Sequence, residues 1–167
     1  MIKHKMMRYN LLFIITLIGF ILCFDAKGKP MDDPLSTSIK VSAAGMEAQN
    51  HRLKVIAQNI ANINVTGKTP DEDPYRRQII FFKNEFDVRL NTKILKVDSI
   101  REDKSPFVLK YEPNHPSADK NGMVKYPNVN LIIETVDSKE AKRTFDANVN
   151  ALEIARSNQN KILDLMR

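Results

Sequence analysis

The chain has 167 residues, of which 43% are hydrophobic and 28% are charged, and a formal net charge of +6. This length fits one ordinary domain, with or without an appended segment. The single cysteine, Cys23, excludes an internal disulfide framework and a cysteine-based zinc site. With only five glycines, the chain has no glycine-rich phosphate loop.

The positive charge is concentrated at the start of the chain. Residues 1–30 hold five basic residues and one acidic residue, which leaves 21 basic and 19 acidic residues in the remainder. Phosphate binding needs a concentrated basic face. The nearly balanced charge of the remainder therefore gives little support to a nucleic-acid partner.

Residues 1–30 read as a hydrophobic leader. Basic residues precede an uncharged run of 14 residues, Leu11 to Phe24, which is short for a membrane span but typical of the apolar region of a signal peptide. A small-x-small cleavage site follows at Ala26-Lys27-Gly28, and Met31 opens a stretch typical of the start of a soluble chain. A cleaved signal, an uncleaved anchor and an over-extended gene start all fit, and each excludes this segment from the fold.

Residues 31–64 are predicted to form an N-terminal helix, spanning about 33–62. Pro34 suits a first helical turn, and Gly45, beside several alanines, gives a thin surface that another helix can approach closely. Apolar and small residues recur with the alternating spacing of four and three residues that marks a coiled-coil seam. The seam consists of Ile39, Ala43, Met46, Asn50, Leu53, Ala57 and Ile60.

Residues 128–167 are predicted to form a second long helix, from about 130 to 165, because this stretch contains neither glycine nor proline. Its seam consists of Leu131, Glu134, Ser138, Ala141, Phe145, Asn148, Leu152, Ala155, Gln159, Ile162 and Met166. The two helices are expected to form a coiled-coil pair. Their polar seam residues fit either the solvated turns of a simple hairpin or the fixing of register among several packed helices, some from other subunits.

Residues 65–127 are predicted to form a small antiparallel β module inserted between the helices. Short segments rich in β-branched and aromatic residues occur at 78–82, 93–98 and 107–111. Six of the eight prolines and the Asn121-Gly122 turn lie between residues 70 and 127. The predicted fold class is therefore α+β.

The sequence contains no local motif for catalysis. His51 is interpreted as a surface or seam residue and His115 as a turn residue. Asp71-Glu72-Asp73 lacks the ligand spacing of a calcium loop, and Glu134, Asp137 and Glu140 are interpreted as a solvated helix face. We therefore expect no catalytic residue, no metal site, no cofactor and no small-molecule substrate.

Several motifs, in order, resemble the bacterial flagellar rod and hook proteins over about residues 32–167. Gln58-Asn59-Ile60-Ala61-Asn62, followed by Thr66-Gly67, resembles the signature that closes the family's N-terminal helix. The stretch from Tyr111 to Asn130 resembles a segment of a rod subunit, and Arg143-Thr144-Phe145-Asp146-Ala147-Asn148 resembles an element of the C-terminal helix.

The resemblance implies a structural subunit of the rod that transmits torque through the basal body in the periplasm. The resemblance also implies that the terminal helices pack in a helical array around a central export channel, and that the subunits are exported through the flagellar type III apparatus. The implied partners are copies of the same chain, other rod proteins, and the export gate or membrane ring. The candidate assembly interface comprises Ile39, Ala43, Gly45, Met46, Asn50, Leu53, Ala57, Asn59, Ile60, Asn62, Phe145, Asn148, Leu152, Ala155, Gln159, Ile162 and Met166.

The leader departs from the family pattern, in which no such hydrophobic segment occurs. This departure supports an alternative, a membrane-anchored periplasmic binding module that retains the rod-protein fold. Membrane contact is expected only if residues 11–24 are retained. A hydrolase that uses His51 or His115 is the weakest of the three hypotheses.

Overall fold

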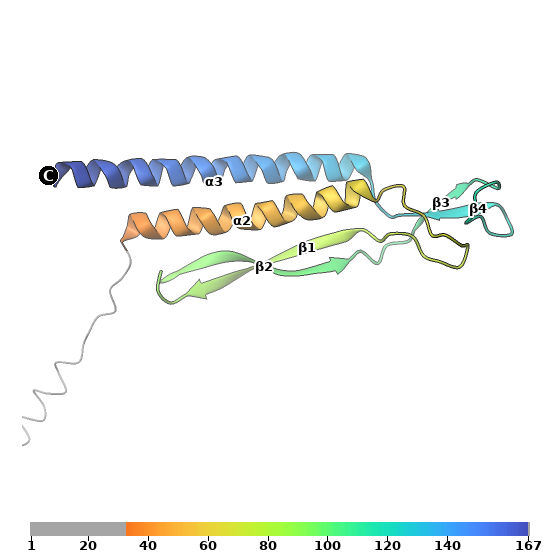
Figure 1. Cartoon of the computed structure of the whole chain (residues 1–167). Helices are drawn as coiled ribbons and strands as arrows, with labels where there is room; N and C mark the ends of the chain where they lie inside the picture. The colour runs from red at the N-terminus through yellow and green to blue at the C-terminus, as the bar shows by residue number, and fades with distance from the viewer. Residues whose placement is uncertain (1–32, 167) are drawn as a thin grey trace, which may run out of the picture. The chain divides into compact units, whose positions relative to one another are not determined.

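The computed structural model describes residues 33–166, so the predictions made for residues 1–30 lie outside the described residues. Along the chain, one long helix precedes four strands and a second long helix follows them (Figure 1). The elements are α2 (Pro34–Ala61), β1 (Gln78–Asp87), β2 (Thr92–Glu102), β3 (Val108–Tyr111), β4 (Met123–Tyr126) and α3 (Leu131–Leu165). The predicted α+β class, with two long helices and an antiparallel β region between them, is confirmed.

The helix ends follow from local chemistry. Pro34 occupies the first turn of α2, and the Asn62 side chain ends this helix by donating to the Gln58 carbonyl at 2.7 Å. At the start of α3, Asn130 Oδ1 accepts hydrogen bonds from the backbone N–H groups of Ile132 and Ile133. Such a cap satisfies two of the backbone donors that the first turn of a helix leaves unpaired.

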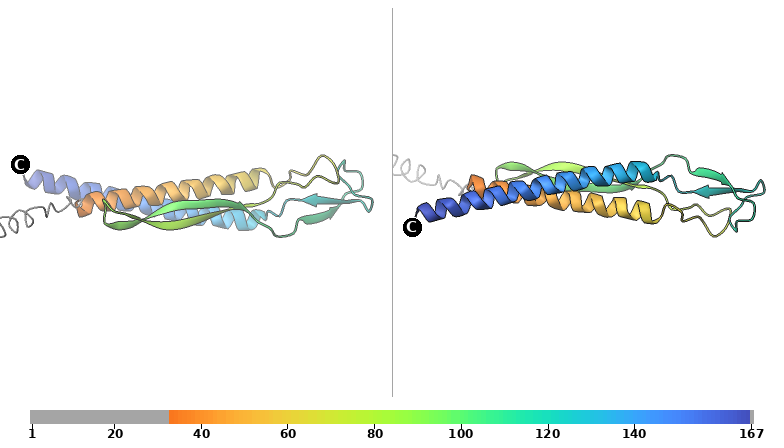
Figure 2. Two further views of the ribbon diagram at one scale, coloured as in Figure 1. Left: turned by 90° about the horizontal axis from the view of Figure 1, so that it is seen from below. Right: turned by 90° about the horizontal axis from the view of Figure 1, so that it is seen from above.

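The two helices pack side by side and antiparallel (Figures 1 and 2). Asn59 near the end of α2 contacts Glu134 near the start of α3, whereas Gly45 lies against Asn148 further along both helices. A Cβ atom added at Gly45 would lie 2.8–2.9 Å from three side-chain atoms of Asn148. The thin surface predicted at Gly45 is therefore a place where α3 closely approaches α2.

The seam predicted for α3 is its packing face. Glu134, Ala141 and Ala155 are buried there, and the seam residues between them are half-buried. Ile162 and Met166, at the end of the seam, are exposed.

The seam predicted for α2 is not the face that packs on α3. Ala43, Asn50 and Ala57 are exposed, and the larger seam residues are half-buried. The buried residues of α2 are Ser42, Gly45, Ala48, Gln49, Val55, Ile56 and Asn59. The physical reason is that α2 packs against two neighbours, α3 and the β1–β2 hairpin, so its buried surface is rotated away from the heptad stripe.

The predicted β module consists of two separate antiparallel hairpins. Strands β1 and β2 form a long hairpin with a register shift between Phe81 and Phe82, and β3 pairs with β4 from Val108–Tyr126 to Tyr111–Met123. The long hairpin lies along α2, which is thus the middle element between α3 and the strands (Figure 1). Gly122 has a φ of 75° in the predicted Asn-Gly turn, a left-handed conformation that glycine adopts readily.

The contact between Gly45 and Asn148 gives a test of the helix pair. We expect Gly45→Val to lower the free energy of unfolding by about 1–3 kcal/mol, because the added side chain overpacks the interface. Urea denaturation measures this change. Ala43→Val, at an exposed position of the same helix, is the matched control and should have a much smaller effect. An equal loss in the Asn148→Ala background would contradict the assigned contact.

Candidate functional site

A buried polar junction forms where α2 ends, β1 begins and α3 begins. We define the junction as Asn59, Tyr75, Arg77, Gln78 and Glu134. Asn59 Nδ2 donates to Glu134 Oε2 at 3.1 Å and to the Gln78 carbonyl at 2.9 Å. Its Oδ1 accepts from the Tyr75 hydroxyl at 2.8 Å and from the Gln78 backbone N–H at 2.9 Å. The amide of Asn59, which is 1% exposed, therefore has all four of its hydrogen bonds.

Glu134 is 0% exposed, and the interpretation of Glu134, Asp137 and Glu140 as a solvated face is wrong for this residue. Its carboxylate accepts from Arg77 Nε at 2.6 Å as well as from Asn59. A buried charge is tolerated when it is paired and hydrogen-bonded. Burial is the largest single influence on the pKa of Arg77 and lowers it, but the hydrogen bond to Glu134 and the negative charges of Glu134, Asp103 and Asp137 together raise this pKa above its ordinary value.

Further contacts extend the junction to the base of the long hairpin. Arg77 also pairs with Asp103 at 3.6 Å and with Asp137 at 3.8 Å, and Asp137 pairs with Arg52 of α2 at 3.4 Å. Asn128 accepts from the Arg77 backbone N–H at 2.8 Å and donates to the Asp103 carbonyl at 3.0 Å. The junction thus fixes both strands of the hairpin relative to both helices. Asn128 lies within the stretch that resembles a rod subunit, but its role in the junction and that of Arg77 were not predicted, since neither residue belongs to a periodic pattern.

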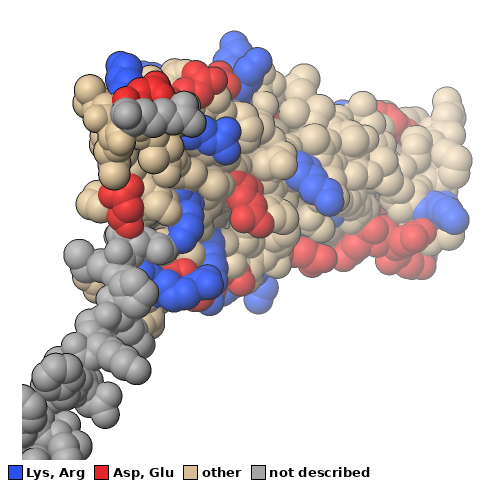
Figure 3. Space-filling model, turned by 60° about the vertical axis from the view of Figure 1, so that its left-hand side comes forward, with Lys and Arg blue, Asp and Glu red and all other residues tan. Residues whose placement is uncertain are grey.

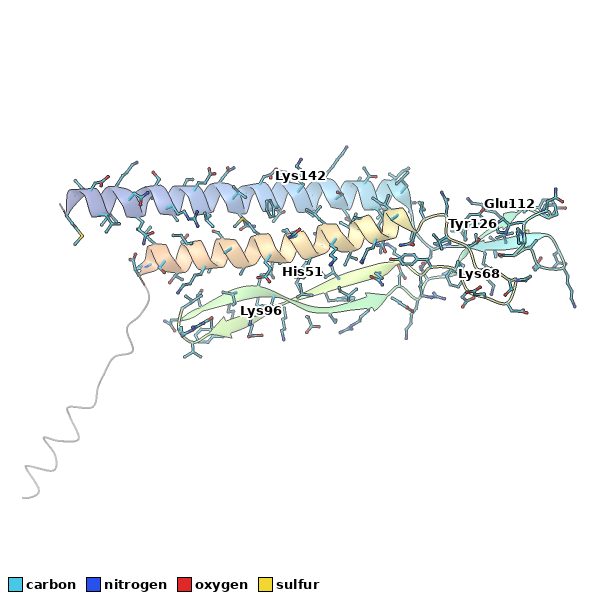
Figure 4. All side chains as sticks on the ribbon, viewed as in Figure 1. His51, Lys68, Lys96, Glu112, Tyr126 and Lys142 are labelled. Atoms are coloured by element: carbon cyan, nitrogen blue, oxygen red, sulfur yellow. The ribbon has the colours of Figure 1, made fainter. Side chains whose placement is uncertain are left out.

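The polar groups of the junction are bonded to one another, and Asn59, Arg77 and Glu134 also line a hollow of about 260 Å³ between α2, β1 and the start of α3. Among residues 33–166, no group of three or more histidine, cysteine or acidic residues could hold a metal ion. His51 projects from α2 on the side of the long hairpin, beside Lys96 (Figure 4), and lines a hollow of about 250 Å³ with Leu95 and Val97. His115 lies in the turn between β3 and β4, where its Nδ1 accepts from the Ser117 backbone N–H.

Two exposed stripes run along the helix pair. The α2 stripe is the predicted seam of that helix, with Ala43, Asn50 and Ala57 open to solvent. The α3 stripe, which the sequence analysis did not predict, consists of Ile133, Val136, Ala147, Ala151 and Ile154, and the exposed charged residues Glu140 and Arg143 lie on the same face between Val136 and Ala147. Its three large residues are 53%, 60% and 63% exposed. The five residues of the α3 stripe recur at intervals of three or four residues, or of a whole number of helical turns. This periodicity is the sequence signal that could have revealed the stripe.

The two stripes lie on opposite sides of the helix pair. An α-helix turns by about 100° per residue, which places Ala43, Asn50 and Ala57 about 120–160° around α2 from Gly45, the residue that lies against Asn148 of α3. The long hairpin covers the other flank of α2, at Ala44, Ala48 and His51. The same geometry places the α3 stripe on the hairpin side, next to Asp137, which shares a hollow with β1 residues.

The predicted interface residues from Phe145 to Gln159, together with Asn59 and Asn62, have internal contacts. Phe145, Asn148, Leu152 and Gln159 are half-buried and Ala155 is buried, all on the packing face of α3. Asn59 lies in the junction, and Asn62 ends α2. The outer face of α3 carries charged residues such as Lys142, which points away from α2 (Figure 4). On the face in Figure 3, basic and acidic side chains are interspersed.

Comparison with known proteins places these helices in a class. The family of flagella basal body rod proteins matches residues 39–67, and the C-terminal family of the flagellar basal body rod proteins FlgE, FlgF and FlgG matches residues 120–165. The two matches fall on α2 with the segment after it, and on α3 with the segment before it. The fold and these matches define a flagellar basal-body rod protein.

Curated relatives identify the particular family. The chain is 42% identical to the flagellar basal-body rod protein FlgC of Agrobacterium fabrum over 135 residues, which is 81% of this chain and 97% of the relative. It is 41% identical to FlgC of Borreliella burgdorferi, over 74% of this chain and 91% of the relative, and 39% identical to FlgC of Salmonella typhimurium, over 75% and 92%. The chain therefore belongs to the FlgC family and is a structural subunit of the flagellar basal-body rod.

The pairing of Arg77 with Glu134 predicts a large loss of stability in Arg77→Met. Removing one partner leaves a buried carboxylate, which costs about 3–5 kcal/mol, and urea denaturation measures the loss. The matched control is Arg101→Met, because this exposed guanidinium stacks on Phe81 and its loss should cost only about 1 kcal/mol. The double variant Arg77→Met/Glu134→Leu should recover part of the loss. No recovery would contradict the pairing.

The lowered pKa of Asp103 leads us to expect that the stability of the protein depends on pH. The backbone N–H of Ser105 is the main cause that lowers the pKa of Asp103 below its ordinary value of 3.8, and Arg77 adds to it. A lowered pKa in the folded state gives stability above the unfolded pKa that is lost as the pH falls through the folded pKa.

Asp103→Asn should therefore make the free energy of unfolding fall less steeply between about pH 5 and pH 2. Urea denaturation across this range measures the slope. Asp71→Asn, in the exposed loop after α2, provides the comparison. An acid slope identical to that of the unchanged protein would refute the contribution of Asp103.

Proposed function

We propose that this subunit joins the rod through the α2 stripe and the α3 stripe, and that the helix pair transmits torque between neighbouring subunits. The observation that carries the proposal is that the helix pair bears two exposed stripes on opposite sides, one of mainly small residues on α2 and one with large apolar residues on α3. Burying a large aliphatic side chain contributes about 1.5–3 kcal/mol. Ile133, Val136 and Ile154 therefore offer a substantial driving force that the single subunit leaves unused.

The placement of the stripes suits an open array rather than a closed dimer. When the α3 stripe of one subunit packs on the α2 stripe of the next, a free α2 stripe and a free α3 stripe remain at the two ends. Contacts of this heterologous kind propagate and form rings or open helical assemblies. A rod is an assembly of the second kind.

The buried junction supports the mechanical role. Because Asn59, Arg77 and Glu134 connect the helices with the base of the long hairpin, a force applied to one element is passed to the others through directed bonds. The subunit can transmit this force along the rod only if both stripes contact partner subunits. We infer that these partners are copies of the chain and other rod proteins, and that the export gate or membrane ring contacts the assembly at its base.

The alternative of a membrane-anchored binding module depends on residues 11–24, which lie outside the described residues. Within residues 33–166, neither helix is long and apolar enough to span a membrane.

The test introduces one charge into each stripe. Ala57→Glu and Ala151→Glu should fold normally, because both positions are exposed, but should fail to restore rods and swimming to cells that lack this protein. Buried in an interface, the new carboxylate would be unpaired and costly. Thermal unfolding of the purified variants checks the fold, and electron microscopy of basal bodies checks assembly.

Gln58→Glu and Asn150→Glu are the matched controls, since each places the same carboxylate one residue away on a different face of the same helix. These controls should assemble rods. If cells carrying Ala57→Glu and Ala151→Glu swim normally, the two stripes are not assembly surfaces.

A further inference from the structure

Two charged residues of α2 lie on either side of Asn50, in the middle of the α2 stripe. At about 100° per residue, Glu47 and Lys54 are within about 60° of Asn50 around the helix, and all three side chains are exposed. None of the three has a hydrogen bond or an ion pair in the described part of the chain. Lys96, which lines the same hollow as Glu47, is already paired with Glu85 at 2.6 Å. The α2 stripe therefore presents a negative and then a positive charge along the chain.

The α3 stripe carries a matching pair of charges. Glu140 and Arg143 lie on its face between Val136 and Ala147, and both are exposed. Although they are only three residues apart, they are not paired with each other or with any other residue from 33 to 166. The α3 stripe thus also presents a negative and then a positive charge along the chain, with apolar or small residues on both sides.

The sizes of the side chains alone do not decide the relative direction of two stripes in contact. Ala43 and Ala57 lie seven residues before and seven residues after Asn50. When Asn50 faces the charged middle of the α3 stripe, either alanine can lie opposite the large residues Ile133 and Val136. Apolar packing therefore fits a parallel and an antiparallel contact equally well.

The charges do decide this direction. In a parallel contact Glu47 would face Glu140 and Lys54 would face Arg143, which places like charges together. In an antiparallel contact Glu47 faces Arg143 and Lys54 faces Glu140, which places opposite charges together. Like charges across an interface are costly, and charges that flank a helix seam set the orientation and the partner. The α2 stripe is therefore complementary to an α3 stripe that runs in the opposite direction.

This arrangement follows when two subunits point the same way. Helices α2 and α3 are antiparallel within one subunit, so two subunits in the same orientation bring α2 of one against α3 of the other in the antiparallel sense (Figure 2). Two subunits that point in opposite directions would make the parallel contact with its like charges. The charge pattern thus favours an assembly in which all subunits have one orientation.

The positions of the charges along the helices also set the relative height of the two subunits. In the register that the contact of Gly45 with Asn148 marks, the level of Arg143 on α3 is three residues from the level of Glu47 on α2. The levels of the second pair differ by one residue. At 1.5 Å per residue, neighbouring subunits are therefore displaced along the helices by no more than about 5 Å. The complementary contact is a side-by-side one.

We propose that the α3 stripe of a second copy of this chain, in the same orientation, occupies the α2 stripe, and that two ion pairs between the subunits fix its register. The pairs join Glu47 with Arg143 and Lys54 with Glu140. The inference rests on the proposed rod function, and it names the partner and the groups that select it. Such pairs contribute more to the choice of partner and register than to affinity.

The experiment reverses the charges of each stripe without changing the net charge of the chain. Glu47→Lys/Lys54→Glu places like charges opposite each other at both pairs, and Glu140→Lys/Arg143→Glu does the same from the other side. Each double variant should fail to restore rods and swimming to cells that lack this protein. The variant that combines all four substitutions should restore both, because opposite charges face each other again. Electron microscopy of basal bodies and swimming in soft agar measure these outcomes.

The matched control is Lys142→Glu/Asp146→Lys, which reverses two exposed charges one turn apart on α3. Lys142 points away from α2 on the outer face of α3 (Figure 4), so this variant should restore rods and swimming. Thermal unfolding of every purified variant checks the fold. Because the two stripes lie on opposite sides of the helix pair, recovery in the combined variant cannot arise within a single subunit.

Two results would overturn the inference. The first is normal swimming with either double reversal. The second is a combined variant that folds but restores no rods, since another rod protein would then occupy the α2 stripe. If Ala57→Glu and Ala151→Glu abolish rods while both double reversals swim normally, the ion pairs are rejected and the stripes remain assembly surfaces. Normal swimming in all of these variants would reject both proposals.

Discussion

The buried carboxylate of Glu134 is the constraint on which the arrangement of the helices and the long hairpin depends. A charge without solvent contact requires a cation and further hydrogen bonds at fixed positions, and here Arg77 and Asn59 supply them from two other segments of the chain. Asn59 in turn holds the backbone of Gln78 through both its N–H and its carbonyl. Hydrogen bonds are directional, so the end of α2, the beginning of β1 and the beginning of α3 meet in one geometry rather than in the range that apolar packing alone would allow.

This geometry explains why the helix pair retains unpaired apolar surface. Fixing the base of the long hairpin beside α2 directs the strands along one flank of that helix, while α3 takes a second flank. The third flank, which carries Ala43, Asn50 and Ala57, is left open, and α3 keeps an exposed stripe because the hairpin packs on α2 instead. A subunit whose helices and strands buried all their apolar surface internally would expose no apolar surface for contact with a neighbouring subunit. In this chain, the junction provides internal order and leaves the stripes available.

The helices and the turns could be predicted from the sequence because they depend on local signals. Heptad spacing, Pro34, the glycine-free C-terminal stretch and Asn121-Gly122 each act within a few residues, and all were recognised. The junction could not be predicted, because Asn59 and Glu134 are 75 residues apart and spacing along α3 does not reveal which cation faces Glu134. The packing face of α2 was misplaced for a related reason. Heptad spacing identifies an apolar stripe but not whether the partner on that stripe belongs to the same molecule.

The sizes of the residues in the two stripes bear on how subunits pair. The α2 stripe is open at small or polar residues, Ala43, Asn50 and Ala57, whereas the α3 stripe presents Ile133, Val136 and Ile154 toward its two ends, with the smaller Ala147 and Ala151 between them. Close packing is best served when large side chains meet small ones across an interface. Contact between two α2 stripes would leave gaps, and contact between two α3 stripes would crowd branched side chains. Unlike stripes therefore pair better than like stripes. The same size difference that favours this pairing also disfavours the symmetric dimer, which would close the interface and end the growth of a rod.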